Sequence, residues 1–97
     1  MPCPFLYVDR MDVTSWTPAG GTVTMFTTPW CGFCVRLKRQ LTDDEIPFTE
    51  VDIEQTPEAA LFVESKNDGN QTVPTVVFPD GSTATNPSLA DVTSGLA

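Results

Sequence analysis

Histidine is absent from the 97 residues of this chain, and its absence removes several classes of mechanism. Imidazole is the usual general base beside a nucleophilic cysteine and the commonest side-chain ligand of metal ions. Long apolar runs are missing too, since no stretch approaches the roughly 20 apolar residues that cross a bilayer. Residues 1–10 lack the basic segment and apolar stretch of a secretory signal. We therefore expect a cytoplasmic protein.

Basic side chains are scarce, with 5 Lys and Arg against 13 Asp and Glu and a formal net charge of -8. Such a balance repels phosphate backbones and anionic lipids, so we expect neither nucleic acid nor a membrane as a partner. The cations are nevertheless clustered, because Arg36, Lys38 and Arg39 directly follow Cys31 and Cys34. This stretch forms a local positive patch in an acidic protein.

Cysteine is too scarce for a disulfide scaffold. An odd count of 3 favours a reducing compartment, since disulfide-stapled secreted domains carry more cysteines in even numbers. A four-coordinate zinc site would need two ligands besides Cys31 and Cys34, and only Cys3 remains. We therefore expect no metal site.

The chain length fits one domain. Residues 1–21, with several Pro and Gly, are predicted to be a peripheral or disordered extension, and residues 22–97 the domain itself. The pattern of apolar and breaking residues predicts strands at 22–26, 48–53, 73–78 and 82–84, with helices at 31–44, at 56–67 and from 86 to 96. Asn86 followed by Pro87 is interpreted as the cap of the last helix. The order β-α-β-α-β-β-α predicts an α/β fold with one four-stranded mixed sheet flanked by helices.

The sequence Trp30-Cys31-Gly32-Phe33-Cys34 lies where the first strand ends and a helix begins. Two cysteines at this spacing can close a disulfide within the first helical turn. The first thiol would lie beside unpaired backbone N–H groups at the positive end of the helix dipole, an environment that favours the thiolate. Cys34, one turn further along, should be more buried. We therefore expect Cys31 to attack and Cys34 to resolve the mixed disulfide. The weaker alternative is that both are ordinary core residues at helical spacing.

Thr72-Val73-Pro74 precedes the most apolar predicted strand. Pro74 is either a simple strand-start proline or the second residue of a cis Val73–Pro74 bond. A cis bond would place the Val73 backbone beside the dithiol, where it could pair with the extended backbone of a bound thiol or peptide. The pattern leaves both readings open.

Four segments together resemble the mycoredoxins, the glutaredoxin-like proteins of actinobacteria with a thioredoxin fold. They are Trp30–Lys38, Glu50–Glu54, Thr72–Val76 and Asp80–Ser88. The resemblance implies reduction of mixed disulfides between proteins and mycothiol. Electrons would come from mycothiol as a cosubstrate and its NADPH-dependent reductase, and no tightly bound cofactor is implied. A monomer is the natural default for the fold.

The resemblance also implies roles for individual residues. Cys31 would be the nucleophile and Cys34 the second thiol. Val73 and Pro74 would form the substrate-side loop. Trp30 and Phe33 would flank the site as substrate-binding residues.

One segment departs from the glutaredoxin pattern. Typical glutaredoxins carry a Gly-Gly-X-X-Asp-like segment before the last helix, where the γ-glutamyl group of glutathione docks, whereas residues 83–88 read Thr-Ala-Thr-Asn-Pro-Ser. We therefore expect Asn86 and Ser88 to bind a different anionic or hydroxyl-rich group through nearby backbone N–H groups. Three alternatives stay open: a glutathione-dependent glutaredoxin, a broader protein-disulfide reductase served by thioredoxin reductase, and an iron–sulfur carrier bridging two subunits through Cys31.

Overall fold

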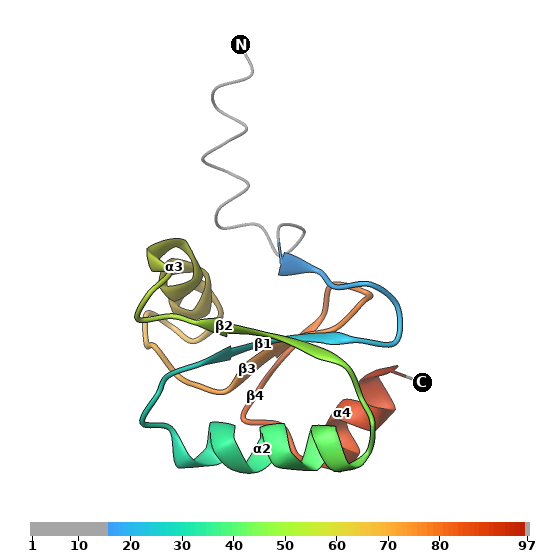
Figure 1. Cartoon of the computed structure of the whole chain (residues 1–97). Helices are drawn as coiled ribbons and strands as arrows, with labels where there is room; N and C mark the ends of the chain where they lie inside the picture. Colours follow the sequence, from blue (N-terminus) through green and yellow to red (C-terminus); the bar gives the residue numbers. More distant parts are fainter. Residues whose placement is uncertain (1–15, 97) are drawn as a thin grey trace.

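A computed structural model describes residues 16–96 of the chain, and Figure 1 shows its ribbon. Its elements are β1 (Val23–Thr27), α2 (Gly32–Asp43), β2 (Phe48–Asp52), α3 (Pro57–Lys66), β3 (Thr75–Val77), β4 (Thr83–Thr85) and α4 (Leu89–Leu96). The predicted order of strands and helices is confirmed, and most predicted ends differ from the observed ones by one or two residues. None of the helices in this described part is long and apolar enough to cross a membrane.

The four strands form one mixed sheet in the order β2-β1-β3-β4. β1 pairs with β2 in parallel, and β3 pairs antiparallel with both β1 and β4. A parallel β-α-β unit needs a crossover helix, which α2 supplies, whereas β3 and β4 are joined by a short turn. This is the predicted α/β arrangement, a thioredoxin-like fold.

Helices cover both faces of the sheet, with α2 and α4 on one face and α3 on the other (Figure 1). The two faces follow from the alternation of side chains along β1. Val23 and Met25 belong to the cluster that packs against α2 and α4, while Phe26 packs against α3. All three side chains are fully buried. The central strand β1 is thus held from both sides, and its carboxyl end is fixed in place.

The start of α4 differs from the prediction. Asn86 does not cap the helix, because its backbone has a positive φ of 49° and its N–H donates to the Pro74 carbonyl oxygen at 2.6 Å. Ser88 is the cap instead: the Asp91 N–H donates to Ser88 Oγ and the Ser88 N–H donates to Asp91 Oδ2, both at 3.1 Å. This reciprocal pair is a capping box. The predicted N-cap, Asn86, was therefore wrong, and the observed one lies two residues later.

Most of the predicted extension, residues 1–15, lies outside the described residues, so its boundary with the domain at residues 21 and 22 stays a prediction. The described part includes Trp16, whose ring lies edge-on to Phe26 with centroids 5.3 Å apart. The Trp16 carbonyl oxygen also accepts a hydrogen bond from Thr24 Oγ1 at 2.8 Å. Trp16 therefore packs on the α3 side of the sheet, away from the predicted dithiol.

Candidate active site

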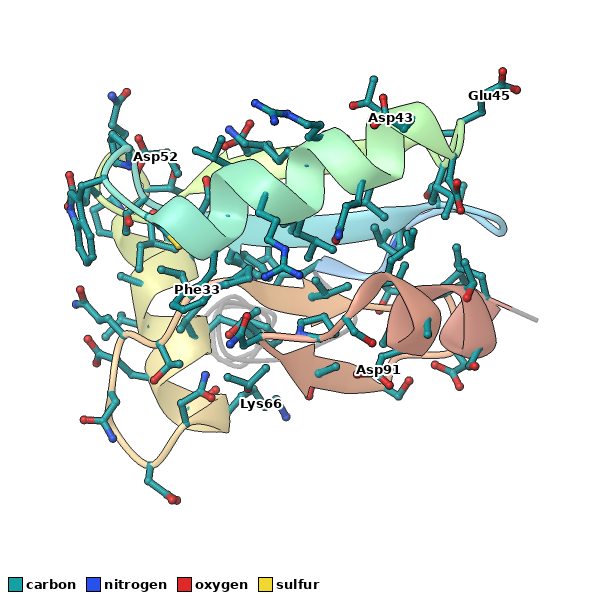
Figure 2. The ribbon with its side chains drawn as sticks, turned by 90° about the horizontal axis from the view of Figure 1, so that it is seen from below. Phe33, Asp43, Glu45, Asp52, Lys66 and Asp91 are labelled. Carbon is teal, nitrogen blue, oxygen red and sulfur yellow. The ribbon has the colours of Figure 1, made fainter. Side chains whose placement is uncertain are left out.

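The cysteine pair lies at the carboxyl ends of the two parallel strands. Thr27, the last residue of β1, is in register with Asp52, the last residue of β2, and the chain then leads from Thr27 into α2. Figure 2 shows Phe33 and Asp52 near the beginning of α2, with Asp43 and Glu45 at its other end. In α/β sheets this edge is where ligands bind, because loops and helix N-termini gather there.

Cys31 is the N-cap of α2, with an extended backbone (φ -87°, ψ 107°). Its Sγ accepts a hydrogen bond from the Cys34 N–H at 3.1 Å and lies 3.8 Å from the Val73 carbonyl oxygen, to which the thiol donates. Cys31 Sγ therefore both accepts and donates a hydrogen bond at the start of α2. Only 5% of the residue is exposed, so an incoming disulfide must approach along a narrow path.

Cys34 is completely buried, and burial is the main reason that its pKa is raised to about 12. The hydrogen bond with the Cys31 side chain raises the pKa further, whereas a backbone hydrogen bond at Thr28 and the charge of Lys38 lower it in part. Cys34 is therefore a neutral thiol at physiological pH. Both cysteines are free in this structure, so the site is described in its dithiol state.

The Val73–Pro74 peptide bond is cis, which decides between the two readings that the sequence left open. The Val73 carbonyl faces Cys31 Sγ, and the Pro74 carbonyl accepts the Asn86 N–H. The structure thus brings together the two cysteines, Val73, Pro74 and Asn86, which lie far apart in the chain.

Two aromatic rings flank the dithiol and face the solvent, since 72% of Trp30 and 61% of Phe33 are exposed. The indole Nε1 of Trp30 donates to Glu54 Oε2 at 2.5 Å. Glu54 is itself placed by a turn in which its N–H donates to Asp52 Oδ1 at 2.8 Å. The loop after β2 therefore fixes the orientation of an exposed tryptophan beside Cys31.

A cavity of about 230 Å³ opens between α2 and the start of α4. Its lining residues are Phe33, Arg36, Leu37 and Gln40 from α2 and Asn86, Pro87, Ser88 and Leu89 from the segment before and into α4. The walls therefore combine an exposed ring with amide, hydroxyl and guanidinium groups. Predicted site residues Phe33, Asn86 and Ser88 meet in this one cavity.

The predicted positive patch is only partly available to a ligand. Lys38 Nζ forms an ion pair with Glu50 Oε2 at 2.9 Å, and Thr27 Oγ1 donates to the same oxygen at 2.7 Å. Partial burial alone would raise the pKa of Glu50, but these two hydrogen bonds and the Lys38 charge hold it below its usual value. Of the three clustered cations, Arg36 is the one that lines the cavity.

Three residues of this site had no predicted binding role, although Arg36 belonged to the predicted positive patch. Arg36 and Gln40 lie one and two turns beyond Phe33 on the same face of α2, and helical spacing could have revealed them. Glu54 is 24 positions from Trp30, and no sequence pattern links the two.

Comparison with known proteins identifies the family. The glutaredoxin family model matches residues 23–82, from the start of β1 to the turn before β4. The chain belongs to the glutaredoxin family. A Mycobacterium tuberculosis protein whose name assigns it to the glutaredoxins is 57% identical over 74 residues, which cover 76% of this chain and 88% of that protein. Mycoredoxin 1 of Corynebacterium glutamicum is 44% identical over 70 residues, which cover 72% of this chain and 86% of that protein.

Solved structures agree on the fold. A crystal structure of a thioredoxin-like protein superimposes with a TM-score of 0.65 at 24% identity, covering 77% of this chain and all of that one. A buckwheat glutaredoxin in complex with glutathione superimposes with a TM-score of 0.62 at 17% identity, covering 94% of this chain and 81% of that one. At these identities the likeness concerns the fold alone. The family assignment makes this chain a glutaredoxin-like thiol–disulfide oxidoreductase.

Proposed function

We propose that this protein reduces mixed disulfides between proteins and mycothiol, using Cys31 as the nucleophile and mycothiol as the cosubstrate. The observation that supports this choice most directly is the capping box at the start of α4, in which the N–H groups of Ser88 and Asp91 already donate to side chains of the chain itself. Similarity to a mycoredoxin at 44% identity points the same way. No tightly bound cofactor is required.

The reaction consists of two thiol–disulfide exchanges. The Cys31 thiolate attacks the mycothiol sulfur of the mixed disulfide, a Cys31–mycothiol disulfide forms, and the client leaves as a thiolate that takes up a proton. A second mycothiol thiolate then attacks the mycothiol sulfur of this intermediate, which releases the mycothiol disulfide and regenerates the Cys31 thiolate. The client sulfur is reduced to a thiol and the incoming mycothiol thiol is oxidised, while the transferred mycothiol sulfur stays at the disulfide level throughout.

Cys34 supplies the alternative second step. Its thiol, once deprotonated, can attack Cys31 Sγ and release mycothiol while an internal disulfide forms. Burial raises the pKa of the Cys34 thiol, so this route requires that its proton be removed during the attack. The buried thiol therefore favours resolution by the cosubstrate and leaves the internal disulfide as a side path.

Charge argues for mycothiol against glutathione. Mycothiol is an uncharged thiol that carries sugar and inositol hydroxyls, whereas glutathione has two carboxylates and a net negative charge. The helix start where an α-carboxylate would find N–H donors is capped by Asp91, and Glu54 adds a further negative charge beside Trp30. These carboxylates disfavour an anionic ligand whereas Arg36 in the cavity wall favours one, so the charge argument rests on the helix N–H groups that Ser88 and Asp91 already engage.

The cavity beside Phe33 fits a hydroxyl-rich group. Arg36 and Gln40 can donate to hydroxyl oxygens, while Asn86 and Ser88 can both donate and accept. We assign these side chains, with Trp30 and Phe33, to the binding of mycothiol. Val73 and Pro74 would hold the amide group next to the reacting sulfur, since the Val73 carbonyl lies beside Cys31.

Partners and setting follow from the same proposal. Protein clients would contact the exposed rings of Trp30 and Phe33, and a monomer suffices because one chain carries both cysteines. Mycothiol chemistry requires a reducing compartment, so we place the protein in the cytoplasm. The second candidate, a broader protein-disulfide reductase served by thioredoxin reductase, also uses these exposed rings as a docking surface.

A competition between cosubstrates tests the proposal. One client peptide is prepared as its mycothiol and as its glutathione mixed disulfide, and wild-type turnover is coupled to each thiol's own NADPH-dependent reductase. The expected result is a kcat/KM for the mycothiol adduct at least tenfold above that for the glutathione adduct. Equal values, or a preference for glutathione, would refute the proposal. Efficient turnover with thioredoxin reductase on a client disulfide, without either thiol, would establish the second candidate instead.

A further inference from the structure

Asn67 joins three elements behind the loop that carries Val73. It is the C-cap residue of α3 (φ -133°, ψ 37°), directly after Lys66, which Figure 2 labels. Its side-chain Nδ2 donates to the Val63 carbonyl oxygen at 2.8 Å and to Thr75 Oγ1 at 3.3 Å. Its Oδ1 accepts from Thr85 Oγ1 at 2.7 Å. One amide therefore connects α3 with β3 and β4.

The network continues to both ends of the Val73–Pro74 segment. Thr75 is fully buried, and its Oγ1 donates to the Thr72 carbonyl oxygen at 2.8 Å. On the other side, Thr85 is followed by Asn86, whose N–H donates to the Pro74 carbonyl at 2.6 Å. The carbonyls of Thr72 and Pro74, on either side of Val73, thus both accept hydrogen bonds. The Val73 carbonyl between them faces Cys31 Sγ.

Asparagine is the side chain that this arrangement needs. The hydrogen bonds of the network run in one direction from donor to acceptor. Thr85 donates to Asn67, Asn67 donates to Thr75, and Thr75 donates to the Thr72 carbonyl. An aspartate has the same shape, but when ionised it only accepts. It could not donate to Thr75 or to the Val63 carbonyl. The position therefore requires an amide.

We propose that Asn67 is a positioning residue for thiol–disulfide exchange, which fixes the Val73 backbone so that it can pair with the amide group of a bound thiol. The inference rests on the proposed role of Val73 in substrate binding. It does not depend on which thiol is bound, because mycothiol and glutathione both carry an amide next to the reacting cysteine.

The test compares an amide-bearing substrate with one that has no amide. Pre-reduced protein is mixed in single turnover with the glutathione or mycothiol mixed disulfide that the wild type handles better, and separately with 2-hydroxyethyl disulfide. The variants are Asn67→Asp and Thr75→Val, each of which breaks the network at one point. Asn70→Ala is the matched control, because it removes the exposed Asn70 Nδ2 bond to the Asn67 carbonyl and leaves the Asn67 side chain untouched.

For Asn67→Asp and Thr75→Val we expect the half-saturating concentration of the amide-bearing substrate to rise roughly three- to tenfold. The limiting rate, the kinetics with 2-hydroxyethyl disulfide and both parameters of Asn70→Ala should stay within about twofold of wild type. A lower melting temperature with unchanged half-saturation, or an equal change on both substrates, would overturn the positioning role. If Asn67→Asp does not fold, Thr75→Val decides alone. Failure of the mycothiol proposal appears instead in which mixed disulfide the wild type prefers, and the comparison between variants can be made with either one.

Discussion

The backbone N–H of Cys34 donates to Cys31 Sγ over 3.1 Å, while the Cys34 thiol itself is completely buried. The two cysteines, three positions apart, therefore differ in their surroundings. Cys31 is the N-cap of α2 and is 5% exposed, whereas Cys34 is completely buried and burial raises its pKa to about 12. This difference is the structural reason for proposing that Cys31 is the attacking thiol.

Selective alkylation tests the asymmetry. Because burial raises the pKa of Cys34 to about 12, its thiol is almost entirely neutral at pH 7. In a Cys3→Ser background, we expect iodoacetamide at pH 7 to modify Cys31 to completion while Cys34 remains unmodified, as read by peptide mass spectrometry. Both cysteines should react once the protein is unfolded in denaturant. Native modification of Cys34 at a rate similar to that of Cys31 would contradict the account.

Serine substitutions should separate the two thiols in turnover. Cys31→Ser removes the nucleophile, and we expect reduction of a mixed disulfide to fall by about 10³-fold or more. Cys34→Ser leaves Cys31 in place, and the cosubstrate can still resolve the intermediate, so activity should stay within about tenfold of wild type. Both variants are measured as kcat/KM on one substrate, with folding checked by circular dichroism. Comparable losses in the two variants would show that Cys34 is essential.

Asp91 should influence the choice of thiol through its charge. Asp91→Asn keeps an oxygen that can accept the Ser88 N–H but removes the negative charge at the start of α4. We expect kcat/KM for a glutathione mixed disulfide to rise about two- to fivefold, the size of a charge effect at a helix end, with no change for the mycothiol adduct. Asp80→Asn is the control, because it removes one carboxylate from the turn at the opposite end of β3 and β4. An equal gain in both variants would indicate net charge alone.

Glu50 should make the folded state sensitive to acid. Its folded pKa lies below the usual value, so its contribution to the free energy of unfolding is complete above about pH 5 and is lost as the pH falls through the folded pKa. The carboxylate side chain is 38% exposed, which limits this contribution to about 1 kcal/mol or less.

Urea unfolding at several pH values between 3 and 7 measures the effect. Glu50→Gln should lower the free energy of unfolding at pH 7 and flatten its fall in acid relative to wild type. Glu45→Gln, which removes a carboxylate at the far end of α2 (Figure 2), should retain the wild-type slope. An unchanged slope in Glu50→Gln would mean that the ion pair with Lys38 does not stabilise the fold.

The local parts of the site could be predicted from the sequence, whereas its long-range parts could not. Cys31 and Cys34 can be recognised from their spacing at a strand-to-helix junction, and Pro74 from its position before an apolar strand. The hydrogen bond between Trp30 and Glu54 depends on how two loops meet, which no periodicity encodes. The prediction placed the N-cap of α4 at Asn86, but Ser88 takes that role through its hydrogen bonds with Asp91. The Asn86 N–H donates instead to the Pro74 carbonyl, which lies far away in the sequence.

The central claim, that Cys31 takes mycothiol from a client, is tested most directly by a single turnover of the Cys34→Ala protein. Reduced Cys34→Ala protein in a Cys3→Ser background is mixed with one equivalent of a mycothiolated peptide, and intact masses are read after quenching with acid. The account predicts that Cys31 gains the mass of mycothiol and that one equivalent of free peptide thiol is released. The peptide on Cys31 with mycothiol released, or no adduct at all, would contradict it.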